Sequence, residues 1–169
     1  MDDKIRFGEG LQVTLLEPIT TIADGRSEWV RLENLQWMTF FVYVGAIVAS
    51  TDSVNVYVYS TTSATSGTTN ANDQSIPFKY RLSSALGVDS WGAITAVTTA
   101  TGYVAIGGTD DNKLLQIEVD PGDIASRDSD AEFIYLEFDA TVTSTDTIYL
   151  GAFGVFEPRY PQNAQITTT

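Results

Sequence analysis

The residues of this chain that could do chemistry are its carboxylates, because histidine and cysteine are both absent. Histidine is the usual general base near neutral pH, and cysteine supplies a thiolate nucleophile and a soft metal ligand. The serines therefore have no histidine to activate them, and no glycine-flanked serine elbow occurs in the sequence. Hydrolysis by a pair of carboxylates is the one enzymatic mechanism that the composition permits.

Four carboxylates lie on or beside predicted strands, where a pair could flank a glycosidic bond. They are Glu118, Glu132, Glu137 and Asp139. Acidic residues of strands are usually solvated, so the same four residues are also expected as an outward-facing row. We predict no catalytic residue among them and expect that the protein is not an enzyme.

Two short acidic segments offer the hard oxygen ligands that calcium prefers. They are Thr109-Asp110-Asp111-Asn112 and Asp128-Ser129-Asp130. Neither segment has the spacing of an EF-hand loop, and aspartate and asparagine are common in ordinary turns. Gly107-Gly108 matches neither a phosphate loop nor a dinucleotide fingerprint and is also interpreted as a turn. We therefore predict no metal site and no cofactor.

Aromatic residues could form a stacking platform, because their rings combine a large apolar area with a polar rim. The candidates are Trp29, Trp37, Trp91, Tyr57, Tyr59 and Tyr103. Strand aromatics usually lie in a core or at a subunit interface. Tyr57 and Tyr59 differ because they alternate with Val54, Val56 and Val58, which places the tyrosines and the valines on opposite faces of a strand. This outward pair could contact a carbohydrate or another protein.

The elements that must position these side chains are strands, since period-2 alternation and β-branched or aromatic residues recur along the chain. The predicted strands cover residues 11–18, 28–33, 36–48, 54–59, 78–83, 92–99, 102–107, 115–120, 133–142 and 147–157. Turn signals separate them at Ala23-Asp24-Gly25, Thr51-Asp52-Ser53, Gly107-Gly108-Thr109-Asp110 and Thr143-Ser144-Thr145-Asp146. This pattern predicts an all-β fold, a single-domain antiparallel β-sandwich that is jelly-roll-like, although the strand order cannot be derived.

The domain organisation is predicted as one sandwich with an extension at each end. Residues 11–157 form the sandwich, residues 1–10 form an N-terminal arm, and residues 158–169 form an extended C-terminal tail. Residues 60–75 are nearly all small and polar, so they predict a long exposed loop. Asp120-Pro121-Gly122-Asp123 places an N-cap residue before a first-position proline and predicts a short helical turn.

The charge balance limits the possible partners, because nine basic and 22 acidic residues give a formal net charge of −13. A nucleic-acid-binding surface needs basic groups, and an anionic membrane would repel the chain, so we expect neither partner. The charge fits solubility, or an acidic surface matched to a basic partner or to divalent cations. No signal-peptide pattern follows Met1, and the longest apolar-rich run, residues 38–49, is too short to span a membrane as a helix. We expect a soluble protein that is made in a cytoplasm.

One motif is Ile76-Pro77-Phe78-Lys79-Tyr80-Arg81-Leu82-Ser83, followed by Asp89-Ser90-Trp91-Gly92-Ala93-Ile94-Thr95. An opening strand at 15–19 and the stretch Trp29-Val30-Arg31-Leu32 precede the motif, and a strand that begins at Phe133-Ile134-Tyr135-Leu136 follows it. In this layout the chain resembles small proteins encoded among the head genes of tailed bacteriophages. The resemblance covers about residues 11–140 and ends before the C-terminal tail.

This resemblance implies a capsid decoration (cement) protein. Such proteins sit on the outside of the shell, commonly as trimers, and bridge capsomers against the pressure of the packaged genome. The family brings no catalytic residue. The expected partners are the major capsid protein and further copies of this chain, and the expected location is the exterior of the virion. The alternative is a carbohydrate- or receptor-binding β-sandwich module, on a phage tail or attached to an enzyme, and a glycoside-active enzyme is a third possibility.

Overall fold

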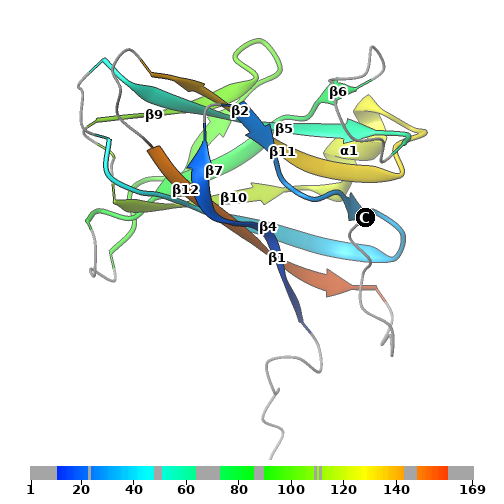
Figure 1. Cartoon of the computed structure of the whole chain (residues 1–169). Helices are drawn as coiled ribbons and strands as arrows, with labels where there is room; N and C mark the ends of the chain where they lie inside the picture. The colour runs from blue at the N-terminus through cyan, green and yellow to red at the C-terminus, as the bar shows by residue number, and fades with distance from the viewer. Residues whose placement is uncertain are drawn as a thin grey trace, which may run out of the picture.

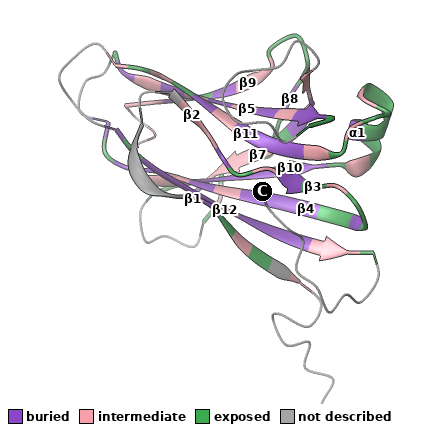
Figure 2. Ribbon diagram, turned by 45° about the vertical axis from the view of Figure 1, so that its right-hand side comes forward, coloured by how far each residue is buried: buried purple, intermediate pink, exposed green. Residues whose placement is uncertain are grey.

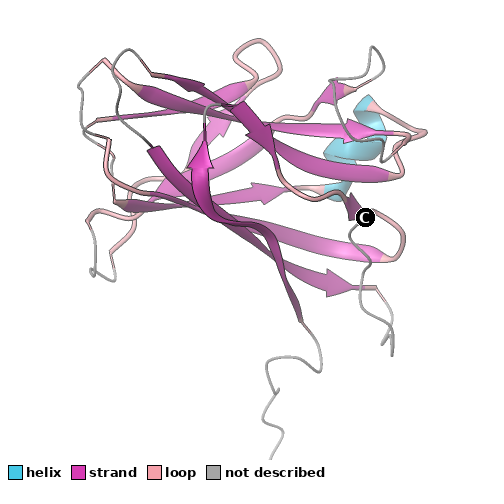
Figure 3. Ribbon diagram, in the orientation of Figure 1, coloured by secondary structure: helices cyan, strands magenta, loops and turns pink. Residues whose placement is uncertain are grey.

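The computed structural model describes residues 11–22, 24–47, 51–63, 73–85, 90–108, 110, 112–142 and 148–159. These residues form twelve strands and one short helix, arranged as two antiparallel sheets that pack face to face (Figure 1, Figure 3). In chain order the elements are β1 (Gln12–Ile22), β2 (Asp24–Arg26), β3 (Val30–Arg31), β4 (Leu35–Val44), β5 (Ser53–Thr61), β6 (Gln74–Ser75), β7 (Phe78–Leu82), β8 (Thr95–Val97), β9 (Tyr103–Gly107), β10 (Lys113–Val119), α1 (Pro121–Arg127), β11 (Phe133–Thr141) and β12 (Ile148–Pro158). The predicted all-β sandwich is confirmed.

The strand order is that of a jelly roll. Sheet A has the order β1-β12-β4-β10-β7-β8, and sheet B has the order β2-β11-β5-β6, with β3 beside β11 and β9 beside β5. Four nested pairs join early strands to late ones: β1 with β12, β2 with β11, β4 with β10, and β5 with β9. These pairs form one long ribbon, and rolling it up adds the contacts of β12 with β4 and of β11 with β5.

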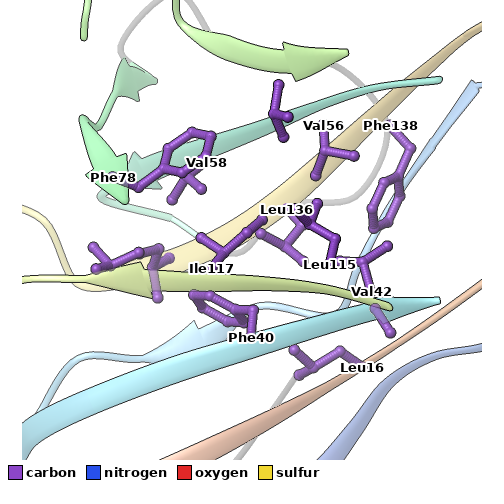
Figure 4. Close-up of a cluster of buried hydrophobic side chains, with 14 of the residues drawn as sticks. Leu16, Phe40, Val42, Val56, Val58, Phe78, Leu115, Ile117, Leu136 and Phe138 are labelled. Carbon is purple, nitrogen blue, oxygen red and sulfur yellow. The ribbon is translucent and has the colours of Figure 1, made fainter. Parts of the chain in front are cut away.

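The core lies between the two sheets, and buried positions run along the strands of both (Figure 2). Sheet B contributes Val54, Val56 and Val58, which are fully buried as the alternation of β5 predicts. The cluster drawn in Figure 4 joins residues of both sheets: Leu16, Phe40, Val42, Val56, Val58, Phe78, Leu115, Ile117, Leu136 and Phe138. Burial of this apolar surface is the main stabilising contribution to the fold.

The predicted helical turn is confirmed, and it lies at one end of the sandwich (Figure 1). The Gly122 backbone N–H donates to Oδ1 of Asp120 at 2.8 Å, so Asp120 caps the first turn of α1. Ile124 is the buried residue of the helix. At the C-terminal end of the helix, Ser60 Oγ donates to Asp128 Oδ2 at 2.7 Å, and this hydrogen bond ties α1 to β5.

Two predictions about connections are wrong. The segment 60–75 is not a loop throughout, because Ser60 and Thr61 are buried at the end of β5 and Gln74–Ser75 form β6. Small polar residues can be buried when they are hydrogen-bonded, as Ser60 is. The predicted turn at residues 23–25 is also wrong in part, since Asp24 begins β2, which pairs with β11. Residues 64–72 lie outside the described part of the chain.

Of the two predicted terminal extensions, only Pro158 and Arg159 are described. Pro158 is the last residue of β12, and the backbone N–H of Arg159 donates to the carbonyl of Asn34 at 2.6 Å. Residues 1–10 and 160–169 are not described, so their roles stay predictions. Within the described residues, no helix has the length and apolar character needed to cross a membrane.

Candidate functional site

The outward pair predicted from the sequence is part of a longer row of rings on the outer face of sheet B. Tyr57 of β5 is the register partner of Tyr103 on β9, and Tyr59 of β5 is the register partner of Tyr135 on β11. Residues that are paired across strands share a face of the sheet. The row, named here the aromatic strip, consists of Trp29, Tyr135, Tyr59, Tyr57 and Tyr103. The outward position of Tyr57 and Tyr59 is therefore confirmed.

The rings of the aromatic strip pack against one another. The ring centroids of Tyr57 and Tyr59 are 5.9 Å apart with planes 18° apart, and those of Tyr59 and Tyr135 are 5.7 Å and 26° apart. At one end of the strip the ring centroids of Tyr103 and Tyr57 are 5.1 Å apart, and at the other end those of Trp29 and Tyr135 are 6.1 Å apart. The ring planes of both pairs are tilted. These distances are typical of favourable aromatic pairs. The stacked rings of Tyr57, Tyr59 and Tyr135 therefore cover part of each other's faces.

Tyr135 anchors the aromatic strip and is itself only 1% exposed. Its hydroxyl donates to Asp73 Oδ2 at 2.8 Å, and the guanidinium carbon of Arg26 lies 5.4 Å from its ring centroid. Arg26 Nε also forms an ion pair with Glu137 Oε2 at 3.1 Å. Burial, followed by the hydrogen bond to Asp73, raises the pKa of Tyr135 well above its usual value. This tyrosine therefore stays neutral and fixes the neighbouring rings.

The hydroxyls of Tyr57 and Tyr59 also stay neutral. Burial raises the pKa of Tyr57, with the charge of Asp139 as the second cause, and it raises the pKa of Tyr59, with the charge of Glu137 as the second cause. A neutral phenol both donates and accepts hydrogen bonds. The strip is therefore an uncharged surface of rings and hydroxyls beside two carboxylates of β11.

Of the four carboxylates predicted as candidates, only Glu137 and Asp139 are neighbours, and the set as a whole is not brought together. Glu118 lies on β10 of sheet A, where it accepts a hydrogen bond from Gln116 Nε2 at 2.9 Å. Glu132 is exposed and precedes β11. Glu137 and Asp139 are two positions apart on the outer face of β11, and the ion pair with Arg26 occupies Glu137.

In the two acidic segments, Asp110, Asn112 and Asp128 have polar partners. Asp110 Oδ1 pairs with Lys113 Nζ at 2.8 Å, and Asn112 Oδ1 accepts from the Tyr43 hydroxyl at 3.3 Å. Asp128 accepts from Ser60, as described above. Thr109 and Asp111 lie outside the described residues. In the described part of the chain, no group of three or more histidine, cysteine, aspartate or glutamate residues could hold a metal ion.

The other two candidate aromatics lie on sheet A, away from the strip. Trp37 on β4 is 37% exposed, and Trp91 forms a bridge with Ser83 and lies under Arg81, whose guanidinium carbon is 4.8 Å from its ring centroid. Trp37 also lines an open groove of about 680 Å³ beside α1, together with Lys79, Glu118, Asp123, Arg127 and neighbouring residues. Both signs of charge line this groove, which was not predicted because its walls come from distant parts of the chain.

Sheet A also carries an outward apolar surface. Leu15 of β1 is paired with Phe153 of β12, which is paired with Phe41 of β4, and Val13 is paired with Val155. The rings of Phe41 and Phe153 stack with centroids 5.0 Å apart. These five residues, Val13, Leu15, Phe41, Phe153 and Val155, are named here the apolar face. The sequence predicted these strands, but it did not show that their outward residues meet.

Comparison with known proteins gives no match. No family model, no curated protein and no solved structure matches this chain. The interpretation of the two surfaces therefore depends on the geometry of the chain and on the sequence resemblance.

Proposed function

We propose that this protein is a non-enzymatic structural protein of a bacteriophage virion, which decorates the outside of the capsid shell and stabilises it by bridging capsid subunits. The sequence motif at 76–83 and 89–95 supports this proposal through its resemblance to head proteins of tailed phages. An antiparallel sandwich with outward contact surfaces on both of its sheets is suited to this task.

The observation that carries the proposal is the pair of outward non-polar surfaces on opposite sides of the sandwich. An antiparallel sheet with one face on a core usually turns polar residues outward on the other face. Here sheet B turns the aromatic strip outward, and sheet A turns the apolar face outward. A bridging protein needs two such surfaces. We assign the shell contact to the aromatic strip, because tyrosine and tryptophan are enriched at the centres of protein interfaces.

The test is co-sedimentation of the purified protein with capsids assembled from the major capsid protein that we expect to be encoded beside it. The double variant Tyr57→Ser, Tyr103→Ser removes two rings of the strip, and we expect binding to fall at least about thirtyfold. The control Ile94→Ser removes a side chain that is 64% exposed and lies outside both surfaces. Failure of the unmodified protein to bind capsids would end the proposal, and full binding by the double variant would end the assignment of the strip.

A carbohydrate- or receptor-binding module is the second candidate. The observation in its favour is the polar border of the aromatic strip, where Asn55 of β5 and Asp139 of β11 are register partners beside Tyr57. A sugar stacks on an exposed ring face, however, and the stacked rings of Tyr57 and Tyr59 cover part of theirs. A glycan array screened with the unmodified protein and with the double variant decides between the two functions. Glycan binding that is lost in the double variant would favour this second candidate.

A further inference from the structure

The apolar face is a continuous surface at one edge of sheet A. Leu15 is 65% exposed and Val13 is 49% exposed, and both lie on β1, the edge strand. Phe153 and Phe41 extend the surface across β12 and β4. Contiguous exposed apolar side chains, unlike isolated ones, usually mark an interaction site.

Two outward-pointing residues, one in the apolar face and one beside it, are already buried within the single chain. Val155 is only 8% exposed, and Thr39, its register partner on β4, is completely buried. Among the described residues, the Thr39 hydroxyl has no hydrogen-bond partner. This burial on the outer side of a sheet shows that the aromatic and aliphatic side chains form a packed outer layer. A packed layer is preformed, which reduces the entropy cost of docking a partner onto it.

The charge of the chain indicates which partner fits. The net charge is −13, so contact between acidic surfaces of two copies is unfavourable at short range. None of the five residues of the apolar face is charged. Two copies can therefore meet there without bringing carboxylates of the face together. A basic partner would instead gain most from the acidic parts of the surface.

The edge position of β1 supports the same conclusion. Among the described strands β1 is paired with β12 alone, and the carbonyl of Leu16 accepts a hydrogen bond from the backbone N–H of Glu28 at 2.9 Å. A long edge strand with exposed apolar residues tends to associate with other chains, and natural proteins usually cover such edges. The register of β1 shifts between Leu15 and Glu17 and again before Thr20, which leaves Val13 and Leu15 on its regular part.

We propose that the apolar face is the contact surface between copies of this chain, with Leu15 as its most exposed residue. This inference deepens the proposed function and rests on it, together with the expectation from the sequence resemblance that further copies of this chain are partners. The arrangement leaves the aromatic strip of sheet B free on the opposite side of each copy. An oligomer built in this way presents several strips to one large partner.

The test compares the variants Leu15→Asp and Ile94→Asp by sedimentation equilibrium. The two side chains are equally exposed, at 65% and 64%, and the Ile94 variant adds the same charge at a distance from the apolar face. We expect the unmodified protein and the Ile94 variant to be oligomers of the same mass. The Leu15 variant should be a monomer, with self-association weakened at least about thirtyfold. Val13→Asp is a second variant of the same face and should behave in the same way.

Three results would overturn the inference: a monomeric unmodified protein, an oligomeric Leu15 variant, or equal dissociation of the Leu15 and Ile94 variants, which would show a general charge effect. Circular dichroism melting identifies any variant that does not fold, and Val13→Asp then replaces Leu15→Asp. Capsid co-sedimentation is measured separately. Loss of capsid binding by an intact oligomer contradicts the proposed function, whereas a persistent Leu15 oligomer contradicts this inference alone.

Discussion

Gly154 shows how a single residue controls the packing of the core. It lies on β12 and is paired with Phe40 and Thr14. A Cβ atom at this position would overlap the ring of Phe156, which packs edge-on against Phe40 with centroids 5.9 Å apart. The missing side chain therefore makes room for one of the largest buried rings of the sandwich.

We predict that Gly154→Ala lowers the free energy of unfolding by about 1–3 kcal/mol, because overpacking forces the Phe156 ring to move. Urea denaturation followed by circular dichroism measures this change. The matched control is Gly107→Ala, since a Cβ atom at Gly107 would meet no other atom within 4 Å. Equal stability of the two variants would show that the core adapts to the added methyl group.

Tyr135 makes the stability of the protein depend on pH in the alkaline range. Its pKa in the folded state is raised above the ordinary tyrosine value of about 10, chiefly by burial. The unfolded chain ionises near that ordinary value, so it releases the proton first as the pH rises. The stabilising contribution of the neutral phenol is complete below about pH 10 and is lost as the pH rises further.

We therefore predict that the melting temperature falls steeply above about pH 10 and that Tyr135→Phe makes this fall shallower. At neutral pH the same variant should lose about 0.5–1.5 kcal/mol, because the hydrogen bond to Asp73 is removed. Thermal melts at a series of pH values measure both effects. Identical alkaline profiles for the variant and the unmodified protein would contradict the assignment to Tyr135.

At the scale of elements, α1 is a short helix that depends on its ends. It has seven residues, and isolated helices of this length are not stable in water. The cap at Asp120, the buried Ile124 and the hydrogen bond between Ser60 and Asp128 hold it against the sandwich.

We predict that Asp120→Ala destabilises the protein by about 1 kcal/mol, whereas Asp120→Asn retains the capping oxygen and has little effect. Chemical denaturation of both variants measures the difference. If both substitutions have the same effect, the carboxylate acts through its charge and not as a hydrogen-bond acceptor.

The elements also show how far the sequence could predict this structure. Alternation predicted the long strands and the outward pair Tyr57 and Tyr59, because a strand of nine residues such as β5 shows its period clearly. The short strands β2 and β6 lie outside the predicted strands, because two or three residues are too few to show a period. Trp29 was among the predicted platform residues, whereas Tyr135 was not, since pairing between distant strands depends on how the ribbon rolls.

At the scale of the whole molecule, the charge remains largely uncompensated. Described ion pairs join Arg26 to Glu137, Arg31 to Glu33, and Lys113 to Asp110. The nine basic residues of the chain cannot neutralise its 22 acidic residues. A strongly acidic surface is suited to a basic shell surface, with divalent cations as an additional means of reducing repulsion.

We predict that capsid binding weakens steadily as monovalent salt rises, because salt screens exposed charges beyond about 8–10 Å. Co-sedimentation at increasing sodium chloride measures this dependence. Binding that strengthens with salt would show that repulsion between copies dominates. Addition of a chelator tests the cations separately, and an unchanged affinity and oligomer mass would exclude their role.

The place of β12 in sheet A has a consequence for biosynthesis. β12 is the last strand of the described chain, yet it lies between β1 and β4 and pairs with both. While the ribosome is still making residues before Ile148, β1 has no neighbour in its sheet and β4 lacks one of its two. Its inward residues, Leu150 and Phe156 among them, are also missing from the core. The sandwich can therefore close only after β12 has emerged, and a nascent chain arrested before that point should remain sensitive to protease along its whole length.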